Sequence, residues 1–398
     1  MTELQMRDNS TTTYGSVAKS FHWLIAALIL TMIPLGIVAN GMADADPLKP
    51  TLFSIHKTMG VFIFFVALAR IAWAVMQPKP GALHADRKAE TFLAGLVHWL
   101  LYASLILVPL SGWVHHAATT GFAPIWWPFG QGLPFVPVDE TLAHTAGSLH
   151  IIFERVLVVS ILLHFAGALK HHFIDKDDTL RRMLPGHTEP GTPPEPAHSN
   201  AAPLVAVGVY AAAIGIGASL GLFTHETIEG VELAEAKGEW VVQDGTLGIT
   251  VRQLGNDVEG SFAEWTAAIN FDETPNGDGK YGDVEVTISI PSLTLGSVTQ
   301  QAMGADFFDA QNHNTATYRA DIFAQDQGYV ARGMLTIRAT GAPVFLPFTL
   351  QIDGDTAVME GQTRVNRTNF RIGNGTQPTE GSLAYDVVIS VNLTAKRG

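Results

Sequence analysis

The first 223 residues contain five stretches of mostly apolar residues, and each stretch, folded as a helix, is about long enough to cross a bilayer. They cover residues 21–40, 51–76, 91–114, 148–173 and 204–223. A helix needs about 20 apolar residues to cross the hydrocarbon core, so the pattern predicts five membrane-spanning helices. After residue 223 the pattern of apolar residues changes. Residues 283–290 and 385–393 alternate between apolar and polar side chains, as half-buried strands do.

The second part of the chain is predicted to be an antiparallel β-barrel. Besides the two alternating stretches, strand-like runs cover residues 240–242, 248–253, 268–271, 315–323, 333–338 and 345–352. Turn-forming residues, such as those at 276–279, separate these runs. About eight antiparallel strands can close into a barrel that encloses one small ligand. A packed and empty barrel interior is the alternative.

The pattern therefore predicts a multidomain protein with an all-α part followed by an all-β part. We expect a membrane domain at residues 1–186, a Pro-rich linker at 187–203, a fifth helix at 204–223 and a barrel domain at 224–398. The charges follow the same division. Residues 1–223 contain 13 Lys and Arg and 14 Asp and Glu, whereas residues 224–398 contain 11 Lys and Arg and 23 Asp and Glu. Such an acidic barrel domain is not expected to bind nucleic acid.

The chain has no cysteine. This excludes thiolate-bound iron–sulfur clusters and c-type haem attached through cysteine, so any haem must be held by histidine or methionine.

Basic residues near the ends of the five stretches predict the orientation in the membrane. Nine basic residues lie in the N-terminus, the 77–91 connection and the 170–200 segment, namely Arg7, Lys19, Lys79, Arg87, Lys88, Lys170, Lys176, Arg181 and Arg182. The connections at 41–50 and 115–147 contain only Lys49. The positive-inside rule then places the N-terminus and the linker in the cytoplasm of a bacterial cell and the barrel in the periplasm. The aromatic loop at 121–138 is expected at the outer interface, either as an aromatic belt or as a lid over a substrate site.

Four histidines are predicted to lie at two depths in the membrane. His150 and His164 are fourteen residues apart, which places them within about 40° on one helix face and about 21 Å apart along its axis. His22 begins the first helix on the cytoplasmic side, and His56 begins the second helix on the outer side. The depths predict two pairs, His22 with His164 and His56 with His150, and each pair can bind one haem iron from both sides. Packing of these histidines in the helix core is the alternative.

Two charged residues are expected near these pairs. Arg70 lies fourteen residues after His56, and therefore about 21 Å further along the same face, at the depth of the inner pair. A buried arginine needs an anion, which a haem propionate would provide, and snorkelling to the cytoplasmic surface is the alternative. Glu154 lies one turn after His150 and either has a functional role or only pairs with Arg155.

The membrane domain resembles the bacterial cytochrome b561 family over about residues 14–186. The motifs are KSFHWL at 19–24, SIHKTMGVFIF at 54–64, VHWLLY at 97–102 and SLHIIFERVLVVSILLH at 148–164. The resemblance implies a four-helix bundle with two non-covalent b haems that exchanges electrons with ubiquinone. In one type of member it oxidises superoxide at the periplasmic face. The family's four axial ligands match His22, His56, His150 and His164, whereas His98 matches a position that is not an axial ligand.

The barrel domain resembles the YceI family of polyisoprenoid-binding, lipocalin-like periplasmic proteins over about residues 236–396. The resemblance rests on Trp240, a Gly-Ser-Phe step at 260–262, GADFFDA at 304–310 and RGMLTIRATGAPVFLPFTL at 332–350. It implies a prenyl lipid or a quinone inside the barrel. Two departures leave the ligand open, because Gly and Thr at 245–246 replace the usual His-Ser, and Asn312 and His313 replace the usual Tyr-Pro.

Three functions are compatible with the sequence. The first is a multi-pass inner-membrane oxidoreductase, similar to a superoxide oxidase, which passes electrons between a periplasmic donor and the quinone pool. The second is an electron relay that anchors a separate dehydrogenase or hydrogenase in the membrane. The third is a carrier of isoprenoid lipid. The sequence assigns no catalytic residue to any of them.

Overall fold

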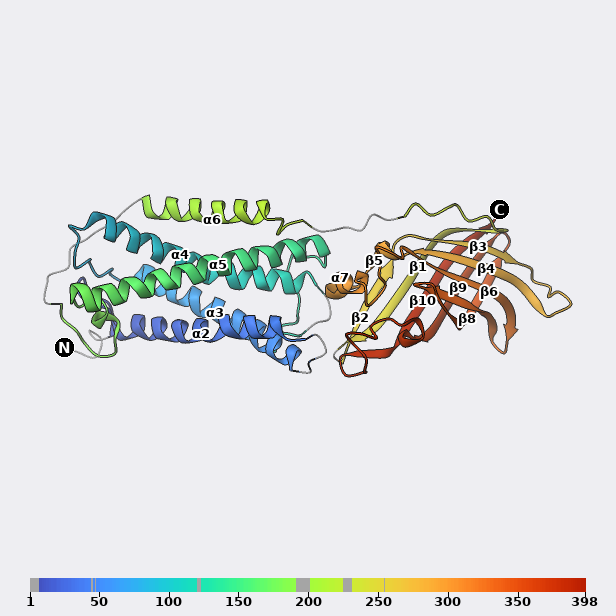
Figure 1. Cartoon of the computed structure of the whole chain (residues 1–398), viewed down its shortest axis with the longest axis horizontal. Helices are drawn as coiled ribbons and strands as arrows, with labels where there is room; N and C mark the ends of the chain where they lie inside the picture. Colours follow the sequence, from blue (N-terminus) through green and yellow to red (C-terminus); the bar gives the residue numbers. More distant parts are fainter. Residues whose placement is uncertain are drawn as a thin grey trace. The chain divides into compact units, whose positions relative to one another are not determined.

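The computed structural model describes residues 7–43, 46, 48–119, 123–190, 201–224, 231–253 and 255–398. Outside the described residues lie most of the predicted linker at 187–203, the first two residues of the aromatic loop at 121–138, and residues 225–230 before the barrel. The chain forms two compact units, a helical one and one formed mainly by residues 226–398 (Figure 1).

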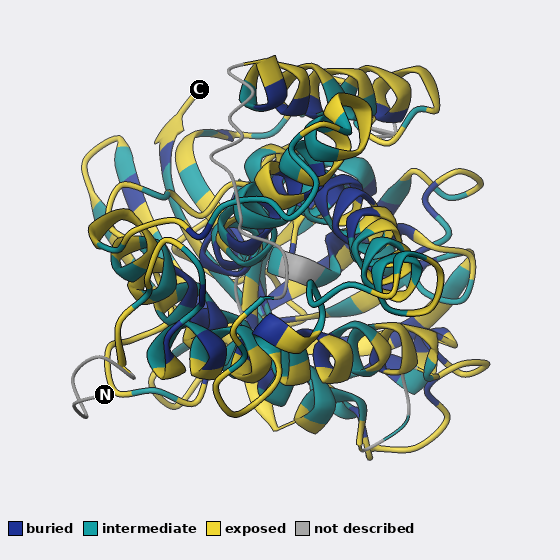
Figure 2. Ribbon diagram, turned by 90° about the vertical axis from the view of Figure 1, so that its left-hand side faces the viewer, coloured by how far each residue is buried: buried dark blue, intermediate teal, exposed yellow. Residues whose placement is uncertain are grey.

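The helical unit contains the five expected apolar helices. They are α2 (Ser16–Gly41), α3 (Lys49–Met76), α4 (Lys88–Ala117), α5 (Glu140–Lys170) and α6 (Ala201–Ser219). Among the described residues, these five are long and apolar enough to cross a membrane, yet only 17–28% of the residues in each apolar stretch are buried. Figure 2 shows exposed positions running along the helices, with buried positions between them. Helices with such wide apolar outer faces need a bilayer as solvent, which confirms the prediction of a multi-pass membrane protein.

Local sequence explains where several helices begin and bend. The side chain of Asp139 caps α5 by accepting the Leu142 N–H at 2.7 Å. Helices α2 and α4 contain Pro34 and Pro109, and each proline leaves one carbonyl of the preceding turn without its helical partner. Helix α5 continues into a short π-helix, η1 (His171–Asp175). Helix α6 begins at Ala201 and ends at Ser219, four residues before the apolar stretch does.

One buried cluster holds α2 to α5 together. It consists of Ile25, Ile29, Ala67, Leu105 and Leu157, which come from all four helices. Helix α6 packs on α4 and α5, where the Tyr210 hydroxyl donates to the Leu100 carbonyl at 3.0 Å and accepts from the Ser104 hydroxyl. The fifth helix is therefore attached to the bundle by buried hydrogen bonds as well as by apolar contacts.

The second unit is a closed antiparallel barrel of eight strands. In ring order these are β1 (Trp240–Gln253), β3 (Trp265–Phe271), β4 (Lys280–Ser289), β6 (Thr315–Gln325), β7 (Gly328–Ile337), β8 (Thr340–Asp353), β9 (Thr356–Asn366) and β10 (Leu383–Arg397), and β10 pairs with β1 to close the ring. Strands β2 (Asn256–Phe262) and β5 (Leu293–Thr294) extend the sheet beside β1. The predicted barrel is confirmed, although β1 joins two predicted strands and β9 was not predicted.

Candidate functional site

The structure brings the four predicted histidines together as two pairs. The rings of His22 in α2 and His164 in α5 have centres 6.0 Å apart, and their planes meet at 57°. The rings of His56 in α3 and His150 in α5 have centres 6.3 Å apart, and their planes meet at 80°. Helix α5 thus contributes one imidazole to each pair, as the fourteen-residue spacing predicted.

These separations suit an ion held between two imidazoles. Two ring nitrogens that each lie about 2 Å from one ion, on opposite sides of it, place the ring centres about 6 Å apart. A direct hydrogen bond between two imidazole rings would bring their centres closer. The residues present therefore fit a metal centre with two histidine ligands, such as a b-type haem.

His150 is oriented by α4. Its Nδ1 lies 2.8 Å from the carbonyl of Val108, and because a carbonyl only accepts, Nδ1 must carry the proton. The other ring nitrogen, Nε2, is then an unprotonated donor for a metal. A Cβ at Gly112 would lie 2.9 Å from His150 Nδ1, so only glycine at this position lets the ring reach Val108.

His56 lies against a second glycine. A Cβ at Gly36 in α2 would approach the His56 Cε1 atom to 2.8 Å. Nδ1 of His56 is buried and forms no hydrogen bond of good geometry among the described residues, and the backbone of Met32 lies near the ring.

His98 also contacts His164, with ring centres 5.3 Å apart at 73°. This separation is shorter than the about 6 Å that ligation of one ion from opposite sides requires. The geometry favours a packing contact for His98 and leaves His22 as the partner of His164.

Two arginines lie towards the inner end of the bundle. Arg70 is placed over the ring of Tyr102, at 5.4 Å from its centroid. Arg182 is only 6% exposed and donates from Nη1 to the Gly81 carbonyl at 3.1 Å, while Nε and Nη2 are buried without a partner among the described residues. Burial raises the pKa of Tyr14, whose ring lies under Arg182, so its phenol stays neutral and supplies no counter-charge.

The carboxylates of Asp177 and Asp178 act on the Arg182 guanidinium from nearby, and a haem carboxylate is a further candidate partner for its two buried nitrogens. From the sequence alone, Arg182 was only one of the basic residues that predict the orientation in the membrane. No local signal distinguishes it from Arg181, because its burial arises from tertiary contacts.

Glu154 and Arg155 form the expected ion pair, with Arg155 Nη1 3.4 Å from a Glu154 oxygen. The two side chains differ in exposure, because that of Arg155 is 70% exposed and that of Glu154 is 19% exposed. The second carboxylate oxygen of Glu154 is buried without a partner among the described residues. The pair itself does not assign Glu154 a function.

The described part of the aromatic loop folds onto the ends of α3 and α4. The ring of Trp127 packs on Trp113 with centres 5.0 Å apart. His116 connects the loop to α3, because its Nδ1 lies 3.3 Å from Lys57 Nζ and its Nε2 lies 2.9 Å from the Gln131 side-chain oxygen. Since Lys57 follows His56, this polar contact adjoins the outer histidine pair.

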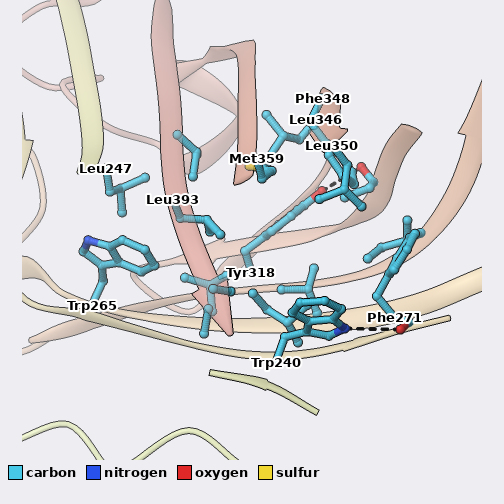
Figure 3. A pocket seen from close by; sticks show the side chains of 18 of the residues that line it. Trp240, Leu247, Trp265, Phe271, Tyr318, Leu346, Phe348, Leu350, Met359 and Leu393 are labelled. Carbon is cyan, nitrogen blue, oxygen red and sulfur yellow. Dashed lines mark hydrogen bonds between the residues drawn. The ribbon is translucent and has the colours of Figure 1, made fainter. Parts of the chain in front are cut away.

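The barrel encloses an apolar cavity of about 150 Å³ (Figure 3). Its wall includes Trp240, Leu247, Tyr318, Leu346, Phe348, Met359 and Leu393, which come from five strands. A second cavity of about 100 Å³ shares Leu247, Ile288, Leu335 and Ile389 with the first. An apolar cavity of this size stays dry and accepts apolar groups.

Two polar side chains in the cavity wall, Tyr318 and Trp240, form hydrogen bonds with the backbone. The Tyr318 hydroxyl lies 2.8 Å from the Ala331 carbonyl and 3.1 Å from the Val344 carbonyl, and Trp240 Nε1 donates to the Phe271 carbonyl at 3.3 Å. Burial raises the pKa of Tyr318, so the hydroxyl remains a neutral donor. The interior therefore offers an apolar ligand contact area and no charge.

Comparisons with known proteins divide the chain in the same way. The family profile of the prokaryotic cytochrome b561 matches residues 13–186, and that of the YceI-like domain matches residues 239–395. Cytochrome b561 homolog 2 of Escherichia coli (strain K12) is 34% identical over 182 residues, which are 44% of this chain and 93% of that protein. The probable superoxide oxidase CybB of Yersinia pestis is 28% identical over 173 residues, which are 43% of this chain and 96% of that protein.

Among solved structures, Burkholderia cenocepacia BcnA is 27% identical, and the match covers 38% of this chain and 96% of BcnA, with a TM-score of 0.36.

The cytochrome b561 match covers the helices that carry the two histidine pairs, and it includes 93% of the Escherichia coli protein. The chain therefore belongs to the prokaryotic cytochrome b561 family, whose members are membrane proteins that bind b-type haem, and it carries a YceI-like barrel after its membrane helices.

Proposed function

We propose that the chain is an electron-transferring cytochrome of the bacterial inner membrane that binds two b haems. One haem binds between His22 and His164, and the other between His56 and His150. The observation that carries this proposal is the presence of two imidazole pairs with centres 6.0 Å and 6.3 Å apart on one shared helix. When bound, the haems supply one-electron oxidation and reduction. Helix α5 sets the separation of the two sites, about 21 Å along its axis.

The remaining residues of the bundle orient these ligands. Val108 holds the proton of His150 on Nδ1, and Gly36 and Gly112 allow the outer imidazoles to approach α2 and α4. Arg70 and Arg182 are the candidate partners of the haem carboxylates at the inner end. Apolar helices on the outside exclude water from both sites.

We further propose that the cytochrome transfers electrons between a periplasmic donor and ubiquinone. Superoxide is the first donor to test, because one relative of this chain is named a probable superoxide oxidase. In the proposed division, residues 1–186 form the haem domain, 187–203 a cytoplasmic linker, 204–223 the fifth span and 224–398 a periplasmic barrel. The barrel would hold a quinone or a related prenyl lipid in its apolar cavity and deliver it to the outer haem site or receive it from there.

Tethering gives the barrel a kinetic advantage over a free carrier. The connection predicted at residues 224–236 reaches at most about 45 Å, so a periplasmic barrel stays close to the outer membrane surface at high effective concentration. A long prenyl tail is insoluble in water, and the dry cavity would shield it.

The test is anaerobic reduction of the purified cytochrome by superoxide or another donor, followed by addition of quinone. We expect deletion of residues 224–398 to slow haem reoxidation by a long-chain ubiquinone about tenfold or more, because the local concentration of ligand is lost. A short-chain analogue, which is soluble, should react at the same rate with both proteins.

Three other outcomes have distinct meanings. Equal slowing with both quinones would contradict delivery by the barrel. Reoxidation only in the presence of a co-purified dehydrogenase or hydrogenase would favour the relay function. Bound prenyl lipid without any haem reduction by candidate donors would favour a lipid carrier.

Orientation is a separate prediction. Five spans and the Lys and Arg distribution place residue 398 in the periplasm. Alkaline phosphatase fused after Gly398 should be active, because it folds only in the oxidising periplasm. The same fusion after residue 190, in the predicted cytoplasmic linker, is the matched control and should be inactive. An inactive fusion after Gly398 combined with an active control would reverse the orientation.

A further inference from the structure

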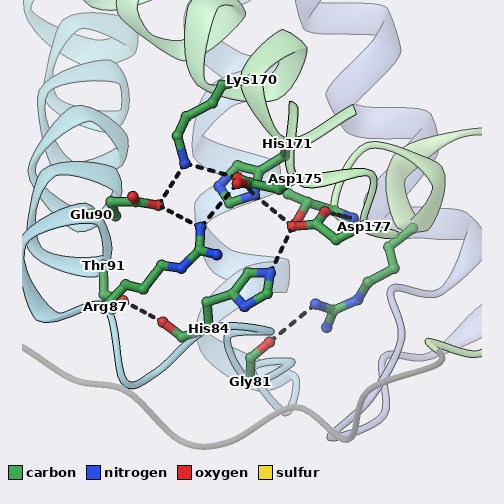
Figure 4. Close-up of polar contacts among 11 residues, drawn as sticks. Gly81, His84, Arg87, Glu90, Thr91, Lys170, His171, Asp175 and Asp177 are labelled. Carbon is green, nitrogen blue, oxygen red and sulfur yellow. Dashed lines mark hydrogen bonds and ion pairs between the residues drawn. The ribbon is translucent and has the colours of Figure 1, made fainter. Parts of the chain in front are cut away.

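A cluster of histidine and carboxylate side chains closes the end of α5, away from the two histidine pairs. There α5 changes into the π-helix η1 (His171–Asp175), and Lys176 follows in the left-handed region with a φ of 57°. π-Helical turns and strained residues of this kind occur often at functional sites. The turn brings Asp175 and Asp177 to the connection between α3 and α4, where His84 and Arg87 lie (Figure 4).

Asp177 lies between two imidazoles. Its Oδ2 atom is 2.7 Å from His171 Nδ1 and 3.1 Å from His84 Nε2. The two rings are almost parallel, with planes at 9° and centres 6.2 Å apart. The three atoms that could bind a metal all lie within 4.8 Å of one another. Residues from two connections that are far apart in sequence therefore converge on one point.

The carboxylate of Asp177 is available for a cation. Its Oδ1 atom accepts the Thr179 N–H at 2.8 Å, which orients Oδ2 towards the histidines. Burial raises the pKa of Asp177, but hydrogen bonds from Thr179 and His171 outweigh this effect and hold the pKa below its usual value. Among the described residues, its ion-pair partners are His84 and His171, with no Lys or Arg within 4.0 Å.

In a neighbouring group of residues, by contrast, the carboxylates already pair with basic side chains. Glu90, His171 and Asp175 also have ligand atoms close together. However, Asp175 pairs with Arg87 at 2.9 Å and with Lys170 at 2.8 Å, and Lys170 also pairs with Glu90 at 2.8 Å. Two basic side chains already neutralise these carboxylates, so a metal ion would have to displace both.

We propose that His84 Nε2, His171 Nδ1 and Asp177 Oδ2 form a binding site for a divalent transition metal, with Zn²⁺ as the best fit. Two imidazoles and one carboxylate are typical zinc ligands, and water completes the tetrahedron in sites with three protein ligands. Mg²⁺ and Ca²⁺ prefer oxygen ligands and are excluded by the two imidazoles. Metal–ligand distances of about 2.0–2.2 Å place neighbouring ligand atoms about 3.3 Å apart, close to the 2.7 Å and 3.1 Å that separate Asp177 Oδ2 from the two imidazole nitrogens.

Metal binding at this site would fasten the end of α5 to the connection before α4. His171 lies seven residues after His164 on the same helix, so the site would limit motion at the end of the element that carries both inner and outer histidines. None of the three ligand residues belongs to the two histidine pairs, and the test of the site can be read without any electron transfer.

The experiment uses the full, haem-loaded chain without an affinity tag, stripped of metal by a chelator and titrated with ZnCl₂ in a calorimeter. We expect one Zn²⁺ per chain and an increase in thermal stability on binding. His84→Gln and Asp177→Asn should each weaken Zn²⁺ binding about tenfold or more while the haem absorption spectrum remains unchanged. MgCl₂ should give no binding signal.

Two variants serve as matched controls. His187→Gln removes another histidine that pairs with a carboxylate, Glu189 at 2.7 Å, and should leave Zn²⁺ binding unchanged. Glu90→Gln removes a member of the neighbouring group and should also leave it unchanged. The proposal is overturned if the unmodified chain binds no Zn²⁺, if both His84→Gln and Asp177→Asn bind as tightly as it does, or if Glu90→Gln alone abolishes binding.

Discussion

Replacing His150 by alanine is expected to remove one of two haems and leave the other in place. The outer imidazole pair then retains only His56, and a haem with one axial histidine and no covalent attachment is held weakly. His164→Ala should in the same way remove the inner haem, and the double variant should contain none. Because the pairs share α5 but no ligand, each loss should be independent of the other.

The measurement is haem per chain by the pyridine haemochrome assay, with absorption spectra of both redox states. His98→Ala is the informative control, because its ring also contacts His164. It should keep both haems, whereas His22→Ala should lose the inner one. One haem in the unmodified chain would refute the proposal, and loss on His98→Ala but not on His22→Ala would reassign the inner ligand.

Filling the barrel cavity is expected to exclude its lipid without unfolding the barrel. Ala331 in β7 and Ala357 in β9 both line the cavity, and leucine adds three carbons at each position. Every CH₂ group that the lipid can no longer bury costs about 0.8 kcal/mol, so each substitution should weaken lipid binding by about 2 kcal/mol, more than tenfold. The new side chains occupy space that is already apolar, so thermal stability should be maintained or increased.

The measurement is prenyl lipid in solvent extracts of residues 224–398 produced alone, with circular dichroism to verify that the barrel is folded. Ala324→Leu is the matched control, because Ala324 lies in β6 with its side chain exposed. It should retain as much lipid as the unmodified barrel. Unchanged lipid content in the Ala331 and Ala357 variants would place the ligand outside this cavity.

The histidine pairs were predictable because helix geometry relates sequence spacing to depth. Fourteen residues in one apolar helix give a fixed rise and nearly the same face, and His22 and His56 begin helices of opposite direction. The glycines that accommodate these rings could not be predicted. Gly36 and Gly112 are two of several glycines in apolar helices, and their role follows only from the helix that lies opposite each of them.

Strand β9 shows the limit of pattern reading in the barrel. Its inward positions alternate between Ala357, Gly361 and Thr363, which are small or polar, and the larger Met359 and Val365, so the apolar signal is interrupted. Gly361 has no room for a Cβ, because Phe348 and Met359 crowd it. Conversely, β1 runs through Gly245, which lies in the gap between two predicted strands, because Gly245 pairs with Leu393 of β10.

The sequence by itself determined the elements whose residues share one environment: five apolar helices in a bilayer, alternating strands around an apolar interior, and two levels of histidine along one helix. In each case a local period reports which side of an element faces solvent, lipid or core. Only the tertiary structure decided what distant segments do together. It aligned His84 with Asp177, buried two nitrogens of Arg182 without a hydrogen-bond partner among the described residues, and closed β10 onto β1. Such contacts depend on how whole elements pack, and no local period records them.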